Sequence, residues 1–405
     1  MKIHRHLVEQ VIAAVHEIFS SRRPADKVLE RYLKTQKKWG ARDRRFFAES
    51  CYEIVRHWRY LWVASGLPPG EFLDADALTP KSVWRLWAFY ENERTGQTPQ
   101  WAETEGLRFQ KTPRESLPRA VRESIPDWLD ELGAKEFGAE WDSLLSALNK
   151  PADVFLRVNR LKGDPGKAVR ELAADEVDAE SVPGLPDALR LPVRKNVFIT
   201  KAFRAGLFEV QDAASQTVAP MLKPEPGLRV VDACAGAGGK TLHLAALMKN
   251  KGRILSLDIH EWKLDQLRER ARRGGVDIVE TRVIESSKTI KRLEASFDRV
   301  LLDVPCSGLG VLRRNPDTKW KLAPAEIDRL RALQSELLAS YSKMLKPGGF
   351  LVYATCSLLP DENERQVKAF LASPAGARWT LEEEQHHRPD REGFDGFYAA
   401  RLRLS

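Results

Sequence analysis

Hydrophobic and polar residues follow one spacing in the first third of the chain. From residue 7 to about residue 145 apolar positions recur every three or four residues, as in RFFAESCYEIVRHWRYLWVAS. This spacing puts apolar side chains on one face of a helix, and Pro24, Pro68 and Pro126 interrupt the pattern. Residues 1–145 are therefore predicted to form an all-α domain of several short helices.

The spacing changes at residue 146. Residues 146–212 are predicted to form a small α+β module, because DVFLRVNRL alternates like a strand, GKAVRELAADE resembles a helix, and the short runs DALRLPV, NVFIT and GLFEVQD look like further strands. From residue 213 to residue 405 strand-like runs alternate with helical patterns, namely LRVVDAC, GRILSLDI, DIVETRVI, FDRVLLDV and GGFLVYATC. Such alternation predicts an α/β domain with a doubly wound parallel sheet, and the tail predicts two antiparallel edge strands.

The distribution of charge along the chain bears on which partner the protein binds. The chain of 405 residues carries a net charge of +8, and its first sixty residues hold 14 Lys and Arg against 7 Asp and Glu. Aromatic residues are interleaved with these cations, namely Tyr32, Trp39, Phe46, Phe47, Tyr52, Trp58 and Tyr60. A basic, aromatic-bearing helical segment favours a polyanion such as RNA. A solvated basic face over an ordinary helical core explains the same pattern equally well.

Other features exclude several classes of protein. The 4 cysteines form no C-x-x-C pair, so we expect neither a metal site nor a disulfide framework. No stretch approaches the length of a membrane helix, and the N-terminus lacks the apolar core of a signal peptide. A cytoplasmic protein without membrane contact is expected.

Two predicted strands deliver cysteines to one edge of the sheet. FDRVLLDVPCSGLG runs from a buried strand into Asp303 and then Cys306, and FLVYATC ends the last core strand at Cys356. Ligands bind at the carboxyl ends of strands in open α/β sheets, and parallel strands bring these ends close together. A buried structural role is common for a single cysteine. It is a weaker explanation for two strand-end cysteines beside an acid.

A glycine turn follows the first strand of this sheet, in the sequence DACAGAGGKT. A phosphate-binding P-loop needs a glycine where Cys234 stands, and the dinucleotide fingerprint needs its third glycine at Thr241. The turn fits Asp-x-x-x-Gly-x-Gly, the pattern of S-adenosylmethionine-dependent methyltransferases. Further strand-end acids suit the ribose (Asp258) and adenine (Glu285). The candidate cofactor residues are Asp232, Cys234, Ala235, Gly236, Gly238, Gly239, Lys240, Asp258, Glu285 and Asp303.

Residues 150–405 resemble the RNA 5-methylcytosine methyltransferases of the Sun/Nop family. The matching stretches are FEVQDAASQ, DACAGAGGKT, LLDVPCSGLG, RRNPDTKW, KPGGFLVYATCS and PDENE. Residues 1–145 are similar, more weakly, to the NusB-like helical RNA-binding domain of the bacterial rRNA-modifying members. The resemblance implies a Rossmann-like methyltransferase sheet, S-adenosylmethionine as cofactor and RNA as substrate.

The resemblance also implies a role for each catalytic residue. Cys356 would attack carbon 6 of cytosine, Asp303 would hold the base at N3 and the exocyclic amine, and Cys306 would assist release of the methylated base. Lys240 is placed to contact the substrate side or to orient Asp303. The chain departs from the family at Ala237, where proline is usual, and at Glu285, where aspartate is expected.

Cations near the predicted site are candidates for contacts with RNA phosphates. They are Arg157 in the α+β module and Arg313, Arg314 and Lys319 after Cys306. A solvated charged loop is the equally common alternative for the last three. The oligomeric state is not predicted.

The leading hypothesis is a methyltransferase acting on carbon 5 of cytosine in small-subunit (16S) rRNA, with tRNA as an alternative substrate. A P-loop-type NTPase would use Gly239, Lys240 and Thr241. A non-catalytic RNA-binding assembly factor would depend on the basic helical domain. Neither of these explains two strand-end cysteines together with Asp303.

Overall fold

The computed structural model describes residues 3–21, 23–109 and 112–405, and the chain forms two compact units. Unit 1 comprises residues 1–151 and 312–323, and unit 2 comprises residues 152–311 and 324–405. The division into three domains stays a prediction. The structure adds that the α+β module and the methyltransferase sheet form one compact unit, and that a short segment from the second half of the chain belongs to unit 1.

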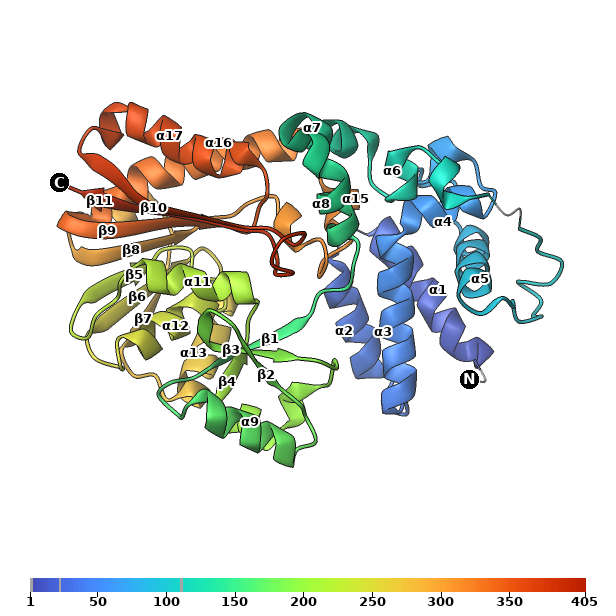
Figure 1. The fold of residues 1–405 in the computed structure, drawn as a ribbon, viewed down its shortest axis with the longest axis horizontal. Coiled ribbons are helices and arrows are strands. Elements are labelled where there is room, and N and C mark those ends of the chain that lie inside the picture. Colours follow the sequence, from blue (N-terminus) through green and yellow to red (C-terminus); the bar gives the residue numbers. More distant parts are fainter. Residues whose placement is uncertain (1–2, 22, 110–111) are drawn as a thin grey trace. The chain divides into compact units, whose positions relative to one another are not determined.

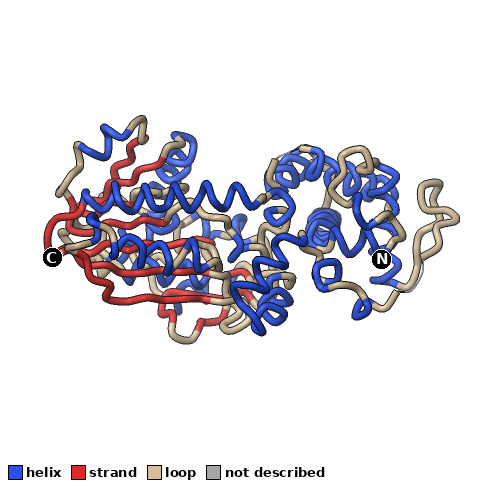
Figure 2. The backbone as a smooth tube through the Cα atoms, turned by 90° about the horizontal axis from the view of Figure 1, so that it is seen from above, coloured by secondary structure: helices blue, strands red, loops and turns tan. Residues whose placement is uncertain are grey.

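Unit 1 consists of helices and loops (Figures 1 and 2). Its α-helices are α1 (Arg5–Ser20), α2 (Ala25–Thr35), α3 (Ala41–Arg56), α4 (Trp58–Ala64), α5 (Pro80–Thr95), α6 (Arg119–Arg122), α7 (Asp127–Phe137), α8 (Trp141–Leu148) and α15 (Thr318–Lys321). Local sequence explains the boundaries of α5, because Thr79 and Ser82 form a capping box at its start and Gly96 ends it in a left-handed conformation.

The aromatic residues of the basic N-terminal segment pack into the core of unit 1. Phe47 and Trp58 are 0% exposed and Tyr60 is 3% exposed. The other aromatic residues of that segment are partly buried against the same cluster. The aromatic part of the expected RNA-binding signal is therefore explained by core packing, and only the cations of this segment still favour a polyanionic partner.

A four-stranded sheet opens unit 2, with the strand order β2-β3-β1-β4. It contains β1 (Val154–Val158), β2 (Glu180–Val182), β3 (Leu185–Leu191) and β4 (Phe208–Val210), with helices α9 (Pro165–Ala174) and α10 (Lys201–Arg204). The strand expected at NVFIT is wrong, because residues 197–199 form a turn of 3-10 helix. The Asn196 side chain accepts a hydrogen bond from Phe198 N, which favours the turn.

The larger sheet has seven strands in the order β10-β11-β9-β8-β5-β6-β7. Its central strands β5 (Arg229–Asp232), β6 (Arg253–Asp258), β7 (Val279–Val283), β8 (Phe297–Asp303) and β9 (Leu345–Thr355) pair in parallel. The edge strands β10 (Trp379–His387) and β11 (Phe397–Leu404) pair antiparallel. The predicted doubly wound sheet and its two antiparallel edge strands are confirmed.

Helices join the strands of this sheet. They are α11 (Ala213–Met221), α12 (Gly239–Leu247), α13 (Glu261–Gly274), α14 (Ser287–Lys291), α16 (Pro324–Tyr341) and α17 (Glu364–Ala372) (Figure 1). None of the helices in the described part of the chain is both long and apolar enough to cross a membrane. Among the same residues, no cluster of three or more His, Cys, Asp or Glu side chains could hold a metal ion.

Candidate active site

The two cysteine-bearing strands are neighbours in the sheet. β8 and β9 pair in parallel with Asp303 beside Ala354, so both strands end at the same edge. The chain turns after each strand, and the sulfur atoms of Cys306 and Cys356 lie 3.2 Å apart. Both residues are partly exposed. The fold thus brings together two thiols that are 50 residues apart in the sequence.

The carboxylate that ends β8 is paired with a lysine from the first turn of α12. Lys240 Nζ lies 2.6 Å from Asp303 Oδ2 and 5.0 Å from the centre of the Phe397 ring. The Asp303 side chain is 29% exposed and that of Lys240 is 10% exposed. The structure thus pairs Lys240 with Asp303, and the proposed role of Lys240 in orienting this carboxylate stays a prediction. The same ion pair argues against the P-loop hypothesis, since that lysine would have to face phosphate oxygens.

The glycine turn between β5 and α12 is held by a carboxylate from the next strand. Gly236 N donates to Asp258 Oδ2 at 2.9 Å, and His260 N donates to Asp258 Oδ1 at 2.9 Å. Gly238 has a φ of +83°, and an added Cβ there would lie 2.1 Å from Leu267. An added Cβ at Gly236 would meet nothing within 4 Å. The turn is therefore open at Gly236, where a ligand can approach the backbone.

Two arginines hold the same turn through its carbonyl groups. Arg157 Nη1 donates to Gly239 O at 2.6 Å, and Arg270 Nη1 donates to Ala237 O at 2.6 Å. Arg157 is 2% exposed and also donates to Gln211. Burial lowers the pKa of Arg157 to about 10, so the side chain stays cationic at neutral pH. The expectation that Arg157 contacts RNA is corrected, because protein acceptors enclose its guanidinium.

Three other predicted cofactor residues line the inner side of this turn. Asp232 is 1% exposed, and its Oδ2 accepts a hydrogen bond from Thr241 Oγ1 at 2.7 Å. Burial raises the pKa of Asp232 to about 7, and the charge of Asp303 adds to this effect. Ala235 is 8% exposed. Burial also raises the pKa of the Cys234 thiol. A thiol held in its protonated form is a poor nucleophile, so Cys234 is not a competing candidate.

The edge beyond β6 carries apolar residues that the sequence analysis missed. Ile259, which directly follows Asp258, is 64% exposed, and Trp262, four residues after Asp258, is 54% exposed. The signal was available as large apolar residues immediately after a strand-end acid, a position where solvent exposure is unusual for them. Glu285 lies after β7 and is exposed. Ile259 and Trp262 are thus exposed apolar residues just after β6, and an acid also follows the neighbouring strand β7.

The basic segment 312–323 belongs to unit 1, and its lysine at 319 is buried there. Lys319 is 2% exposed. Its Nζ donates to Arg56 O at 2.9 Å and to Asn149 Oδ1 at 3.0 Å. Burial holds its pKa well below the usual value for lysine. The expected contact of Lys319 with RNA is corrected, because acceptors within unit 1 already take its hydrogen bonds.

The two arginines of this segment differ from each other in exposure. Arg313 is 9% exposed, and its Nη2 donates to Pro151 O at 2.9 Å. It therefore also serves the packing of unit 1, and the expected contact of Arg313 with RNA is corrected for that reason. Arg314 is only partly buried. Its contact with RNA stays a prediction.

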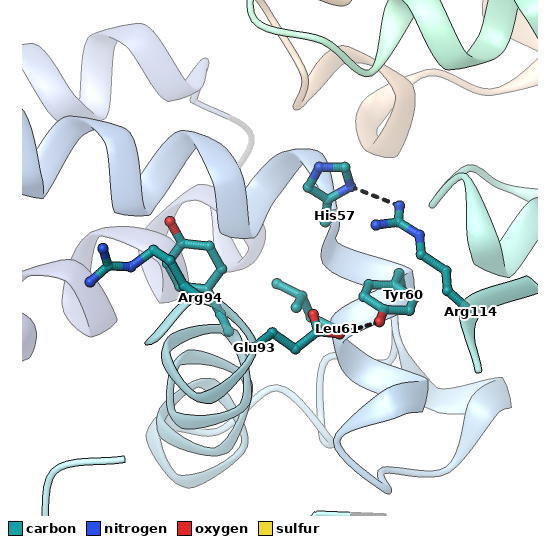
Figure 3. Close-up of a pocket in the computed structure, with 7 residues that line it drawn as sticks. His57, Tyr60, Leu61, Glu93, Arg94 and Arg114 are labelled. Atoms are coloured by element: carbon teal, nitrogen blue, oxygen red, sulfur yellow. Dashed lines mark hydrogen bonds between the residues drawn. The ribbon is translucent and has the colours of Figure 1, made fainter. Parts of the chain in front are cut away.

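A cavity of about 200 Å³ lies within unit 1 and is lined by residues other than those of the predicted site (Figure 3). The Arg114 guanidinium covers the Tyr60 ring at 4.3 Å, and its Nη2 lies 3.5 Å from His57 Nδ1. The Tyr60 hydroxyl donates to Glu93 (Figure 3). Because these polar groups already bond to one another, we assign no ligand to this cavity.

His57 in this cavity predicts an acid sensitivity of unit 1. Burial, with the charges of Lys319, Arg114 and Arg56, lowers its pKa from 6.5 to about 3. Between pH 6.5 and about pH 3 His57 is protonated in the unfolded chain and neutral in the folded chain. The free energy of unfolding therefore falls as the pH drops below 6.5. The free energy of unfolding of the unmodified protein should fall between about pH 7.5 and about pH 5. We expect this fall to be about 1–2 kcal/mol smaller in His57→Gln.

Urea unfolding followed by tryptophan fluorescence at both pH values measures this effect, because 9 of the 11 tryptophans lie in unit 1. His6→Gln is the matched control, since the His6 side chain is 70% exposed. The same pH dependence in His57→Gln and in the unmodified protein would contradict the prediction.

Comparisons with known proteins agree with this fold. The model of the 16S rRNA methyltransferase RsmB/F family matches residues 219–403, and that of the ferredoxin-like domain of RsmF/B-like methyltransferases matches residues 125–197. A curated relative, the probable ribosomal RNA small subunit methyltransferase B of Synechocystis, is 37% identical over 72% of this chain and 69% of its own length.

Two solved structures are also similar. The crystal structure of PH0851 has a TM-score of 0.78 and 26% identity, and the match covers 100% of this chain and 99% of that chain. A methyltransferase homolog from Pyrococcus horikoshii has a TM-score of 0.64 and 29% identity, over 73% of this chain and 100% of that chain.

The sheet, the glycine turn and these matches define a methyltransferase that uses S-adenosylmethionine as its methyl donor. The residues present fit this cofactor, because the glycine turn is open at Gly236 and an acid from the next strand holds it. Within this class the chain belongs to the RsmB/F family of 16S rRNA methyltransferases.

Proposed function

We propose that this protein methylates carbon 5 of a cytosine in small-subunit rRNA through a transient bond between Cys356 and the base. The observation that carries the proposal is the pair of partly exposed thiols 3.2 Å apart beside the carboxylate of Asp303. The remaining groups of the site support the same chemistry.

Carbon 5 of cytosine is a poor nucleophile, which explains why an attacking thiol is needed. Addition of a thiolate to carbon 6 turns the base into an enamine whose carbon 5 can attack an electrophilic methyl group. The base then loses its carbon-5 proton and the thiolate leaves again. A thiol suits this role because its thiolate forms near neutral pH and is a good leaving group.

The two sulfur atoms are assigned different roles. The resemblance to the Sun/Nop family assigns the attack on carbon 6 to Cys356 and the release of the base to Cys306. The hydrogen bond to Cys356 and burial raise the pKa of the Cys306 thiol, which supports Cys306 as the hydrogen-bond donor of the pair. Cys306 then takes part in proton transfer and in release of the methylated base. Asp303, oriented by Lys240, would bind the base at N3 and its exocyclic amine.

The cofactor would be held at the open side of the glycine turn. The backbone of residues 236–239 would hold its amino-acid part, Asp258 would hold its ribose, and Ile259 with Glu285 would contact its adenine. When bound, S-adenosylmethionine supplies an electrophilic methyl group. The protein's own residues activate the base that receives it.

The target base must be accessible to this pocket. A paired cytosine cannot reach the sheet edge without leaving its stack, so a loop, bulge or helix end is the expected position. The curated relative from Synechocystis carries the name of a ribosomal RNA small subunit methyltransferase, and this supports rRNA over tRNA as the substrate.

Bisulfite mapping of total RNA from a deletion strain and its parent tests the proposed function. We expect one or a few cytosines of the small-subunit rRNA to lose protection in the deletion strain, and plasmid-borne enzyme to restore it. Loss of protection in tRNA alone would show that the substrate is tRNA and not rRNA. Unchanged protection in all RNA would contradict the proposal.

A further inference from the structure

The two cysteine turns share a short sequence and a local geometry. Cys-Ser-x-Leu occupies residues 306–309 after β8 and again residues 356–359 after β9. In both turns the serine oxygen accepts the backbone N–H of the leucine two residues further on, at 3.4 Å in the first turn and 3.1 Å in the second. The hydroxyls of Ser307 and Ser357 lie 3.1 Å apart. Each sulfur is thus followed by a serine whose hydroxyl lies beside the serine hydroxyl of the other turn.

One buried carboxylate binds both serines. Glu362 is 0% exposed and ends the 3-10 turn Pro360–Glu362. Its Oε2 accepts hydrogen bonds from both serine hydroxyls. Its Oε1 accepts from Ser307 N at 2.8 Å and from Gln334 Nε2 at 2.9 Å. These donors fill the roughly four acceptor positions of an ionised carboxylate.

The charge of Glu362 is stabilised by hydrogen bonds alone. Within the described residues no Lys, Arg or His forms an ion pair with it. A buried carboxylate is costly unless its acceptor positions are filled, so loss of either serine contact disfavours this arrangement. The carboxylate therefore holds both turns together and is held by them.

Other contacts tie the same turns to each other, to helix α16 and to the start of helix α17. Gln334 Nε2 also donates to Pro305 O at 2.9 Å, immediately before Cys306. Gly310 N donates to the backbone oxygen of Cys356 at 3.0 Å. Asn363 Nδ2 donates to Ser357 O at 3.0 Å. The position of each sulfur is thus determined by the backbone of both turns.

We propose that Glu362 is a positioning residue for the cysteine pair, which sets the separation of the two sulfur atoms through Ser307 and Ser357. Its catalytic consequence rests on the proposed function, in which one sulfur bonds carbon 6 while the other acts near carbon 5 of the same ring. Adjacent ring atoms require a small and constant separation of the two sulfurs. A displacement of about 1 Å in such a site can cost about 100-fold in rate.

The electrostatics of the cluster agree with this role. The pKa of the Cys306 thiol is raised first by its hydrogen bond to Cys356 and by burial, and the charge of Glu362 adds to both. The carboxylate thus also favours the proton on Cys306. Its neutral amide counterpart in Glu362→Gln keeps the size of the side chain and removes this charge.

Disulfide formation between Cys306 and Cys356 does not depend on activity. Its rate depends on the separation of the two sulfurs and on the thiolate fraction, and variants of Ser307 and Ser357 change the first while they keep the charge of Glu362. The azo compound diamide takes up one hydrogen from each thiol as it becomes a hydrazine, and the sulfur–sulfur bond forms in the protein. We expect Glu362→Gln in the full chain to form this disulfide about tenfold more slowly, because the effective concentration of one thiol at the other falls. Mass spectrometry of alkylated peptides measures the rate.

Glu364→Gln is the matched control, since it makes the same change two residues along the chain on a side chain that is only partly buried. It should keep the rate of the unmodified protein. Ser307→Ala and Ser357→Ala each remove one donor and test the same contact if Glu362→Gln does not fold. Each should slow the disulfide, and adding Glu362→Gln to the double serine variant should slow it no further. Unchanged rates in Glu362→Gln or in both serine variants would overturn the proposal.

Methylation assays separate this proposal from the proposed function. We expect kcat of Glu362→Gln to fall about 100-fold while KM for S-adenosylmethionine stays within about twofold, since the glycine turn is untouched. A slower disulfide in Glu362→Gln together with no cytosine methylation by the unmodified protein would support the positioning role and reject the proposed function. A lower kcat with an unchanged disulfide rate would overturn the positioning role while leaving the function intact.

Discussion

Replacement of Cys306 by alanine is expected to leave a covalent protein–RNA complex that survives denaturing gel electrophoresis, whereas Cys356→Ala should form none. In the proposed mechanism Cys356 makes the bond to the base, and Cys306 is needed for its release. Cys356→Ala should lose methyl transfer altogether, because no thiolate then activates carbon 5. Cys306→Ala should lose turnover about 100- to 10,000-fold, the range for a missing acid–base group, because each protein stays bound to RNA after one methyl transfer. Incubation with target RNA and radiolabelled S-adenosylmethionine measures both results.

Cys51→Ala is the matched control for this experiment, because Cys51 is a fully buried cysteine of unit 1 far from either strand end in sequence. It should methylate RNA and accumulate no complex. An adduct in Cys356→Ala and none in Cys306→Ala would exchange the two roles. Adducts in neither variant would contradict covalent catalysis.

Asp303→Asn is expected to lower kcat about 100- to 10,000-fold, the range for an acid that acts directly on the reacting group. Asparagine keeps the size of the side chain but cannot hold a proton at N3, and it loses the 2.6 Å ion pair with Lys240. Binding of S-adenosylmethionine, measured by calorimetry, should change by less than about threefold, because the glycine turn keeps its contacts.

Asp298→Asn offers a closely matched control. Asp298 lies near the other end of the same strand, and its carboxylate pairs with Lys346 at 2.8 Å. The variant loses a comparable ion pair, yet it should keep kcat within about twofold, since its site is remote from the cysteine edge. Equal losses in both variants would indicate that β8 is merely destabilised. Full activity of Asp303→Asn would remove Asp303 from the mechanism.

The sequence by itself determined the elements that carry the chemistry. Strand-like runs ending in Asp303 and Cys356 could be read directly, because buried parallel strands are apolar and end abruptly at polar loops. The glycine turn was equally legible, since the positions of its glycines distinguish it from phosphate-binding turns. From these runs the parallel sheet, the shared edge and the two thiols followed.

Only the tertiary structure determined which of the predicted RNA-binding cations are buried. Lys319 and Arg157 look like RNA contacts in the sequence, but both are buried by acceptors that come from distant segments. Arg56 O lies 263 residues before Lys319, and Gly239 O lies 82 residues after Arg157. Burial of a cation depends on where such oxygens are placed, and no local spacing of residues encodes this.

The separation of the two cysteines is another property that the sequence by itself does not determine. The sequence places Cys306 and Cys356 at one sheet edge but does not say what sets their separation. The sequence shows Glu362 within PDENE but indicates no role for it, because its hydrogen-bond donors Ser307, Ser357 and Gln334 come from three other segments. A buried carboxylate acquires its function only when the fold assembles its donors, and that assembly is decided in three dimensions.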